Sequence, residues 1–319
     1  MGKSSNLCGG CNLCEDSGET EKKTKGSPRQ IAFFGKGGIG KSTISSNVAA
    51  AMADKGLKVM VVGCDPKSDC TRNLRGDVEI PTISEVLRGK MDAQLELDEF
   101  IYGKDMKIDE VVFSGYNGIL CTEAGGPEPG TGCAGRGVVV AVELLKRIGV
   151  FKKYELDVVI YDVLGDIVCG GFGMTLRKGM ADQAIIVTSA DYLAMFAANN
   201  ICKGIARYAD RGGTPLGGFI YNVRGAVDDF ELVDEFAGMA GSRIIGSIPG
   251  NRAITENEIY GQTTIERQPG SEIARKFADL AENILENGDR VIPTPLASQE
   301  LTSMARRISE KARTCVRET

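Results

Sequence analysis

Residues 31–42 are IAFFGKGGIGKS, and this stretch decides the fold of the 319-residue chain. Its first four residues are apolar and predict a short buried strand, while residues 35–42 match the pattern G-x-x-x-x-G-K-[S/T]. Residues 43–55 then predict a helix that ends at Gly56. A glycine-rich loop between a strand and a helix is the context in which this pattern indicates a phosphate-binding loop.

The loop supplies the groups that a bound triphosphate requires. Its glycines let backbone N–H groups surround phosphate oxygens, and the start of the helix adds the positive end of its dipole. We expect Lys41 to reach the β- and γ-phosphates and the Ser42 hydroxyl to bind Mg²⁺. A structural glycine-rich turn is the alternative, but motif and flanking elements agree on nucleotide binding. The predicted nucleotide contacts of the loop are Gly35, Lys36, Gly37, Gly38, Ile39, Gly40, Lys41, Ser42 and Thr43.

The composition is that of an ordinary globular protein, with 42% hydrophobic and 25% charged residues. The net charge of −5 argues against a broad nucleic-acid surface. No apolar run approaches the length of about 18 residues that spans a membrane. The N-terminus is polar and has no signal-peptide pattern, so we expect a cytoplasmic protein without nucleic-acid or membrane partners.

Buried strands alternate with helices along the rest of the chain. This order predicts the α/β class: a single P-loop NTPase domain with a mostly parallel sheet and helices on both faces. We expect the domain to cover residues 30–290, after a flexible cysteine-containing extension (1–29) and before a C-terminal tail with a basic helix (291–319). The predicted strands are 58–63, 155–162, 183–188, 216–221 and 243–248, and the predicted helices include 138–148, 192–210 and 271–286.

Two aspartates follow buried strands at the edge of the sheet where ligands collect. Asp162 ends the apolar run VVIYD and is predicted to hold Mg²⁺ through water. Asp65 lies in CDPKSD (64–69), directly after the strand 58–63. Either aspartate alone is also typical of a helix N-cap. Together with the phosphate loop upstream, they favour a catalytic site.

Lys36, at the second loop position, adds a second expectation. The loop GKGGIGKS resembles that of the family containing the Soj/MinD-type partitioning ATPases, arsenite-pump ATPases and nitrogenase iron proteins. In that family this lysine reaches across a dimer interface to the nucleotide of the partner. The resemblance therefore implies a homodimer with two ATP sites that face each other.

The chain has ten cysteines and no histidine, which favours thiolates as metal ligands. Cys133 and Cys169 lie in glycine-rich backbone, where amide groups can approach and stabilise thiolate sulfur. An iron–sulfur cube needs four thiolates, so two per chain suffice if a dimer shares one cluster. Buried free thiols are the alternative, and we expect that simpler role for Cys64, Cys70, Cys121, Cys202 and Cys315.

A closer resemblance rests on GPEPGTGCAGRG and YDVLGDIVCGGFG, which look like the two cluster-ligand motifs of nitrogenase iron proteins. The segments GKGGIGKST, CDPKSD, FAANNICKGI and VIPTP also match, and the similarity runs from about residue 30 to residue 295. The resemblance implies that Cys133 and Cys169 bind the cluster. Lys36, Lys41, Ser42 and Asp65 would contact the nucleotide, with Asp162 and Asp166 as switch acids, Asn222 at the adenine and Arg136 at the docking surface.

The resemblance implies an ATP-dependent electron donor: a homodimer with one bridging [4Fe–4S] cluster and Mg-ATP in each chain. A ferredoxin or flavodoxin would reduce it, and it would pass electrons to a larger nitrogenase-type catalytic protein. Similar proteins serve nitrogenase-like reductions of methylthio-alkanes and tetrapyrroles. A non-redox ATPase switch of the partitioning or positioning type and an iron–sulfur cluster carrier remain open.

The sequence departs from the family in three places. Gly250-Asn251 replaces the Arg-Asp pair that nitrogenase iron proteins typically carry after the matching proline. Residues 77–117 follow the family pattern poorly. The extension before residue 30 lies outside the family core, and its Cys8-x-x-Cys11-x-x-Cys14 either binds a second metal or belongs to a disordered tail.

Overall fold

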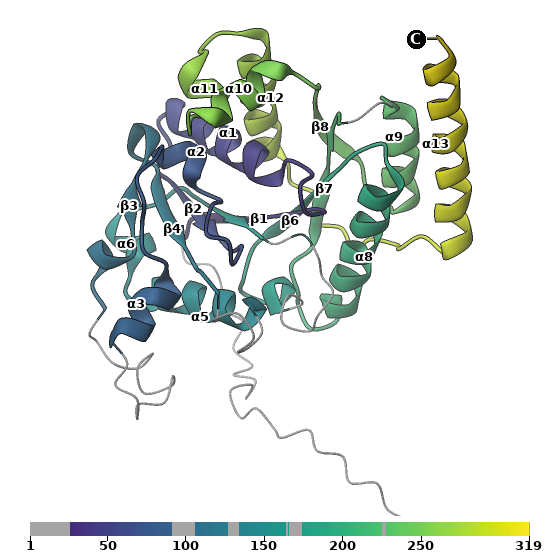
Figure 1. Cartoon of the computed structure of the whole chain (residues 1–319). Coiled ribbons are helices and arrows are strands. Elements are labelled where there is room, and N and C mark those ends of the chain that lie inside the picture. Colours follow the sequence, from purple (N-terminus) through teal and green to yellow (C-terminus); the bar gives the residue numbers. More distant parts are fainter. Residues whose placement is uncertain are drawn as a thin grey trace, which may run out of the picture.

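The computed structural model describes residues 26–90, 106–126, 134–163, 165, 174–224 and 228–318. Within them the core is an eight-stranded sheet in the order β3-β4-β2-β5-β1-β6-β7-β8, in which β3 alone is antiparallel to its neighbour (Figure 1). The strands are β1 Arg29–Phe34, β2 Val59–Gly63, β3 Phe113–Ser114, β4 Leu120–Glu123, β5 Val158–Asp162, β6 Gln183–Thr188, β7 Leu216–Asn222 and β8 Ile244–Ile248.

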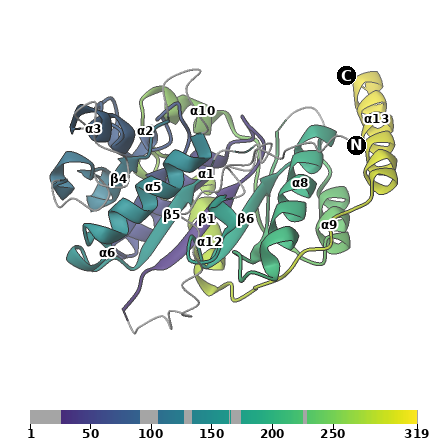
Figure 2. The same cartoon turned by 90° about the horizontal axis from the view of Figure 1, so that it is seen from below.

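Helices cover both faces of the sheet, as Figure 2 shows from below. The helices are α1 Lys41–Asp54, α2 Arg72–Arg75, α3 Ile83–Lys90, α5 Ala134–Arg147, α6 Val150–Lys153, α8 Tyr192–Ala209, α9 Phe230–Met239, α10 Arg252–Ile259, α11 Thr264–Arg267, α12 Glu272–Glu286 and α13 Ser298–Glu318, with 3-10 turns at Ile108–Glu110, Tyr116–Gly118 and Met174–Leu176.

Alternation along the strands divides the apolar core into two layers. In β1, Ile31 and Phe33 pack in the layer under α1 and α12, whereas Ala32 and Phe34 pack in the layer of α3, α5 and α8. All four side chains are at most 1% exposed. A strand buried on both faces is a continuous apolar run, which is why the sequence predicted it.

The predicted α/β fold with a mostly parallel sheet and helices on both faces is confirmed, and several element boundaries are corrected. The predicted strand 155–162 begins only at Val158, because Glu155 adopts a left-handed φ of 49°. Helix α1 begins two residues before the predicted position, and α5 begins four residues before it. The sequence analysis did not predict strands β3 and β4; β3 lies in the segment 77–117 that follows the family pattern poorly, and β4 begins three residues after that segment.

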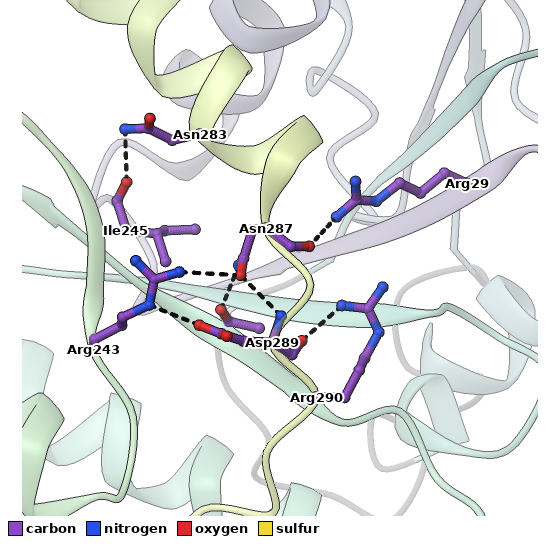
Figure 3. Close-up of polar contacts among 8 residues, drawn as sticks. Arg29, Arg243, Ile245, Asn283, Asn287, Asp289 and Arg290 are labelled. Atoms are coloured by element: carbon purple, nitrogen blue, oxygen red, sulfur yellow. Dashed lines mark hydrogen bonds and ion pairs between the residues drawn. The ribbon is translucent and has the colours of Figure 1, made fainter.

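Polar contacts join the amino-terminal ends of the strands to the end of α12 (Figure 3). The Arg29 guanidinium donates to the Asn287 carbonyl at 2.6 Å, and the Asn287 amide donates to the Gly217 carbonyl at 2.6 Å. Arg243 donates to the Asp289 carboxylate at 2.7 Å. Because β1 runs from this edge toward the phosphate loop, these contacts fix the strand that carries the loop.

The C-terminal helix α13 packs beside α8 and α9, with Leu301 and Met304 buried in the core. Upstream of it, the Asn199 side chain exchanges two hydrogen bonds with the backbone of Leu296, at 2.7 and 3.0 Å. Within the described part of the chain, no helix has the length and apolar character needed to cross a membrane. Cys8, Cys11 and Cys14 lie outside the described residues.

Candidate functional site: the phosphate loop and its neighbours

The phosphate loop lies at the carboxyl end of β1, and α1 begins at Lys41. Gly40 adopts a left-handed φ of 92°, and a Cβ there would lie 2.5 Å from the Asn222 amide nitrogen. A Cβ on Gly165, just after β5, would lie 1.7 Å from the Gly35 carbonyl oxygen. The backbone is therefore drawn tightly together at positions that only glycine allows. Such a cradle fits a bound phosphate chain.

Lys41 and Asp162 form a buried ion pair behind the loop. Lys41 is 7% exposed and Asp162 is fully buried. Burial alone would lower the pKa of Lys41, but the charge and hydrogen bond of Asp162, together with smaller contributions that include Asp65, outweigh burial, and the pKa is raised. The Ser45 hydroxyl donates to the second carboxylate oxygen of Asp162 at 3.3 Å. The two residues predicted to act on phosphate and Mg²⁺ thus meet in one place.

Asp65 follows β2, as predicted, and lies close enough to Lys41 to raise its pKa by charge attraction. Its carboxylate accepts a hydrogen bond from the Lys67 backbone N–H at 2.9 Å, and its carbonyl accepts one from Ser68 N–H at 3.0 Å. These bonds form a tight turn beside the phosphate loop. Lys36 is half-buried in the loop, and its predicted reach into a partner subunit stays a prediction.

A cleft of about 280 Å³ opens beside the start of α1. Asn222 lines it, but its amide nitrogen donates to the Ile39 carbonyl at 2.7 Å and so also supports the phosphate loop. Thr43 donates from its hydroxyl to the Glu258 carboxylate at the same cleft. Gly250 and Asn251, the departure from the family pattern, lie in its wall. Contact with adenine by Asn222 remains a prediction.

Sequence reasoning missed three polar residues near the predicted nucleotide site. Arg224 donates to the Gly38 carbonyl at 2.6 Å. It was missed even though it lies only two residues after Asn222, the predicted adenine contact. Glu258 reaches the cleft from α10, a helix that was not predicted. Glu123 is a fully buried carboxyl at the end of β4. An acid at the end of an apolar run was the available signal, but the run before Glu123 was too short to identify as a strand.

Cys64, Cys70, Cys121 and Cys202 are buried free thiols, as predicted. Burial raises the pKa of Cys121 to about 12 and that of Cys202 to about 12, so both thiols are protonated at neutral pH. In the described ranges, no three Cys, Asp or Glu side chains converge as metal ligands would.

The predicted cluster site cannot be located in these ranges. Cys133, Cys169 and Asp166 lie outside the described residues, as does the side chain of Cys315. Arg136 is in α5, and its side chain also falls outside the described part.

Relatives named nitrogenase iron protein match this chain over nearly its whole length. A nitrogenase iron protein 2 from Methanothermococcus thermolithotrophicus is 53% identical over 283 residues, which cover 89% of this chain and 97% of that relative. A nitrogenase iron protein from Methanococcus voltae is 50% identical over 285 residues, covering 89% of this chain and 98% of that relative.

Solved structures share the fold at lower identity. A ParA family ATPase from Chlorobium tepidum has a TM-score of 0.59 at 20% identity, covering 81% of this chain and 99% of that one. The MinD cell division ATPase of Pyrococcus furiosus has a TM-score of 0.55 at 20% identity, covering 81% of this chain and 98% of that one. These likenesses establish a P-loop ATPase fold and nothing finer.

The family model described as 4Fe-4S iron sulfur cluster binding proteins, NifH/frxC family, matches residues 29–311. This range contains the phosphate loop, Asp65, Asp162 and both glycine-embedded cysteines. The chain therefore belongs to the NifH/frxC family of 4Fe-4S iron sulfur cluster binding proteins.

Proposed function

We propose that this chain is the ATP-dependent reductase of a nitrogenase or nitrogenase-like system. It acts as a homodimer that binds Mg-ATP in each chain and holds one [4Fe–4S] cluster between Cys133 and Cys169 of the two chains. It passes electrons to a larger catalytic protein. The observation that carries this proposal is the buried Lys41–Asp162 pair, because Asp162 comes only seven residues before Cys169 in the sequence.

That pair gives the nucleotide a direct way to move the segment toward Cys169. When a triphosphate binds, Lys41 exchanges the Asp162 carboxylate for the β- and γ-phosphates. Asp162 then loses its compensating charge, and with the Ser42 hydroxyl it would hold, through water, the Mg²⁺ that accompanies the triphosphate. The main chain after Asp162 follows this change, as a nucleotide-sensing switch segment does.

Hydrolysis in this proposal is mainly electrostatic. Lys41 and, from the partner subunit, Lys36 stabilise the charge that develops on the transferring phosphoryl group. Asp166 orients the attacking water, and Asp65 contacts the nucleotide and responds to the loss of the γ-phosphate. The adenine occupies the 280 Å³ cleft beside Asn222.

The bound cluster supplies storage of one electron at low potential. In this proposal a ferredoxin or flavodoxin delivers that electron, and Arg136 in α5 contributes to docking on the larger protein. The similarity to proteins named nitrogenase iron protein supports this assignment. Gly250 and Asn251, in the wall of the cleft, differ from the Arg-Asp pair of the typical family pattern. For this reason the proposal includes a nitrogenase-like final reaction beside that of a true nitrogenase.

The experiment is anaerobic turnover with the natural partner. The full chain is purified under argon, the co-purifying protein is identified, and the two are mixed with Mg-ATP and dithionite. Reduction of acetylene would support a true nitrogenase system. Reduction of a tetrapyrrole or methylthio-alkane instead would place the chain in a nitrogenase-like system. ATP hydrolysis without electron transfer to any co-purifying protein would overturn the proposal.

A further inference from the structure

Glu123 is a buried acid that the proposed function does not use. It ends β4 in lateral register with Gly63 of β2, and Gly63 is in turn in register with Asp162 of β5. Side chains in register on parallel strands point to the same face of a sheet. Glu123 and the catalytic Asp162 therefore lie on one face, separated by a residue without a side chain.

Because Gly63 has no side chain, the carboxyl group of Glu123 fits beside it. A Cβ on Gly63 would lie 1.8 Å from the Glu123 Oε2 atom. Glu123 is fully buried, and Oε2 finds no hydrogen-bond partner among the described residues. Burial raises the pKa of Glu123 to about 7, against the opposing effect of its hydrogen bonds from Thr71. A half-satisfied buried carboxyl is costly, so a role beyond packing is expected.

The other oxygen, Oε1, holds the end of the Asp65 loop. It accepts from the Thr71 backbone N–H at 2.8 Å and from the Thr71 hydroxyl at 2.6 Å. Thr71 follows the loop of residues 64–70 and precedes α2. Both hydrogen bonds thus run between β4 and the loop that carries Asp65.

A second contact joins the same two segments. A Cβ on Gly126 would lie 2.9 Å from the Pro66 Cβ atom, so the chain after β4 rests directly on the residue next to Asp65. Ala124 N–H also donates to the Gly63 carbonyl at 2.8 Å. The loop of residues 64–71 and the segment of residues 123–126 are therefore held together at both of their ends.

We propose that Glu123 is a positioning residue that makes these two segments move as one unit and so links the nucleotide to Cys133. Gly126 is seven residues before Cys133, just as Asp162 is seven residues before Cys169. Each cysteine then has its own connection to the nucleotide. This inference rests on the proposed function, in which Asp65 responds to ATP and Cys133 binds the cluster.

Hydrogen exchange of the full chain, with and without a non-hydrolysable Mg-ATP analogue, tests the link directly. The peptides compared cover residues 64–71, 120–126 and 134–141. Glu123→Leu removes both bonds to Thr71, whereas Glu123→Gln keeps an oxygen acceptor there. Thr71→Val removes the hydroxyl donor alone. Asn199→Leu breaks a buried side-chain tether of comparable strength far from the loop and serves as the matched control.

In the wild type and in Asn199→Leu, we expect the analogue to change exchange in all three peptides. In Glu123→Leu the change at residues 64–71 persists, but the change at 120–126 and 134–141 falls by about fivefold or more, the scale of an ordinary coupling free energy. Glu123→Gln restores most of that response, and Thr71→Val gives an intermediate response.

Three results separate failure of the link from failure of the function. An unchanged response at 120–141 in both Glu123→Leu and Thr71→Val overturns the link and leaves the proposed function standing. A wild type that responds at 64–71 but not at 120–141 also overturns the link. Absence of any nucleotide response in the wild type, together with iron-free protein, overturns the proposed function itself.

Discussion

Lys41 and Asp162 show how a single residue pair joins structure and chemistry in this chain. Both side chains are buried, and the positive charge of Lys41 is the main compensation for Asp162. Removing one member of a buried pair leaves an uncompensated charge, which is far more costly than replacing both. If the pair also acts on the nucleotide as proposed, its structural and catalytic effects can be separated by substitution.

We predict that Lys41→Met lowers the free energy of unfolding by about 3 kcal/mol, because it leaves the Asp162 carboxylate buried without a partner. The double variant Lys41→Met/Asp162→Asn should regain most of this stability. Both variants should lack ATP hydrolysis. Urea unfolding and phosphate release measure the two properties. Equal destabilisation in the single and double variants would contradict a charge-based explanation.

Glu123 gives a prediction about pH. Its pKa is about 7 in the folded chain and 4.5 in the unfolded reference. Below about pH 4.5 both states hold the proton. Between 4.5 and 7 the unfolded state releases it first, so stability falls as pH rises, and above 7 both states are ionised. Burial of the ionised group then costs about 3 kcal/mol.

Glu123→Gln has no such titration. We therefore expect the stability of the wild type relative to Glu123→Gln to fall by about 3 kcal/mol from pH 4.5 to above pH 7. The charged groups that act on Glu123 are Arg75 and Asp162, and both are kept in the variant. Chemical denaturation at a series of pH values gives the difference. A constant difference across this range would show that Glu123 is ionised throughout.

At the scale of elements, the junction between β5 and the phosphate loop is the tightest point of the site. We predict that Gly165→Ala weakens nucleotide binding by more than tenfold, because its Cβ would lie 1.7 Å from the Gly35 carbonyl oxygen. Gly238→Ala in α9 is the matched control, since its Cβ meets nothing within 4 Å. It should bind nucleotide normally and gain about 0.5–1 kcal/mol of stability. Titration calorimetry measures both affinities.

The elements also show which features a sequence can reveal. Strands β1, β2, β6 and β7 were predicted because burial on both faces leaves a continuous apolar run. Strand β4 was missed because LCTE is short and ends in a carboxylate, whose burial depends on Gly63 of another strand. Periodicity along one segment carries no information about such a neighbour.

The same limit applies to the site. The phosphate loop and Asp162 were found because their spacing is local and their chemistry needs specific residue types. Other contacts are hydrogen bonds between segments far apart in the sequence: Asn222 with Ile39, and Thr43 with Glu258. These contacts follow from strand order and from α10, neither of which a linear pattern specifies.

At the scale of the whole molecule, the groups of the site gather where the parallel strands end. Glu123 and Asp162 are the last residues of β4 and β5, and Asp65 and the phosphate loop follow the neighbouring strands β2 and β1. Ligands bind at this edge in open α/β sheets. The contacts of Arg29 with the end of α12 lie at the opposite edge (Figure 3).

The proposed dimer makes a prediction for Lys36. If this lysine completes the partner's site, Lys36→Gln should slow ATP hydrolysis by about 100-fold while nucleotide affinity changes little, because one stabilising donor is lost in the transition state. Mixing inactive Lys36→Gln with Lys41→Met chains should restore hydrolysis in one of the two sites of each heterodimer. No restoration in the mixture would contradict a site shared between chains.

The central claim is that two chains share one iron–sulfur cluster, and iron analysis with EPR of the anaerobic, dithionite-reduced protein tests it most directly. We predict about four iron atoms per dimer with the signal of a reduced [4Fe–4S] cluster. The signal should be lost in Cys133→Ala and in Cys169→Ala, and kept in Cys202→Ala, whose buried thiol serves as the control. An iron-free dimer that hydrolyses ATP, or full iron content in both cysteine variants, would contradict the account.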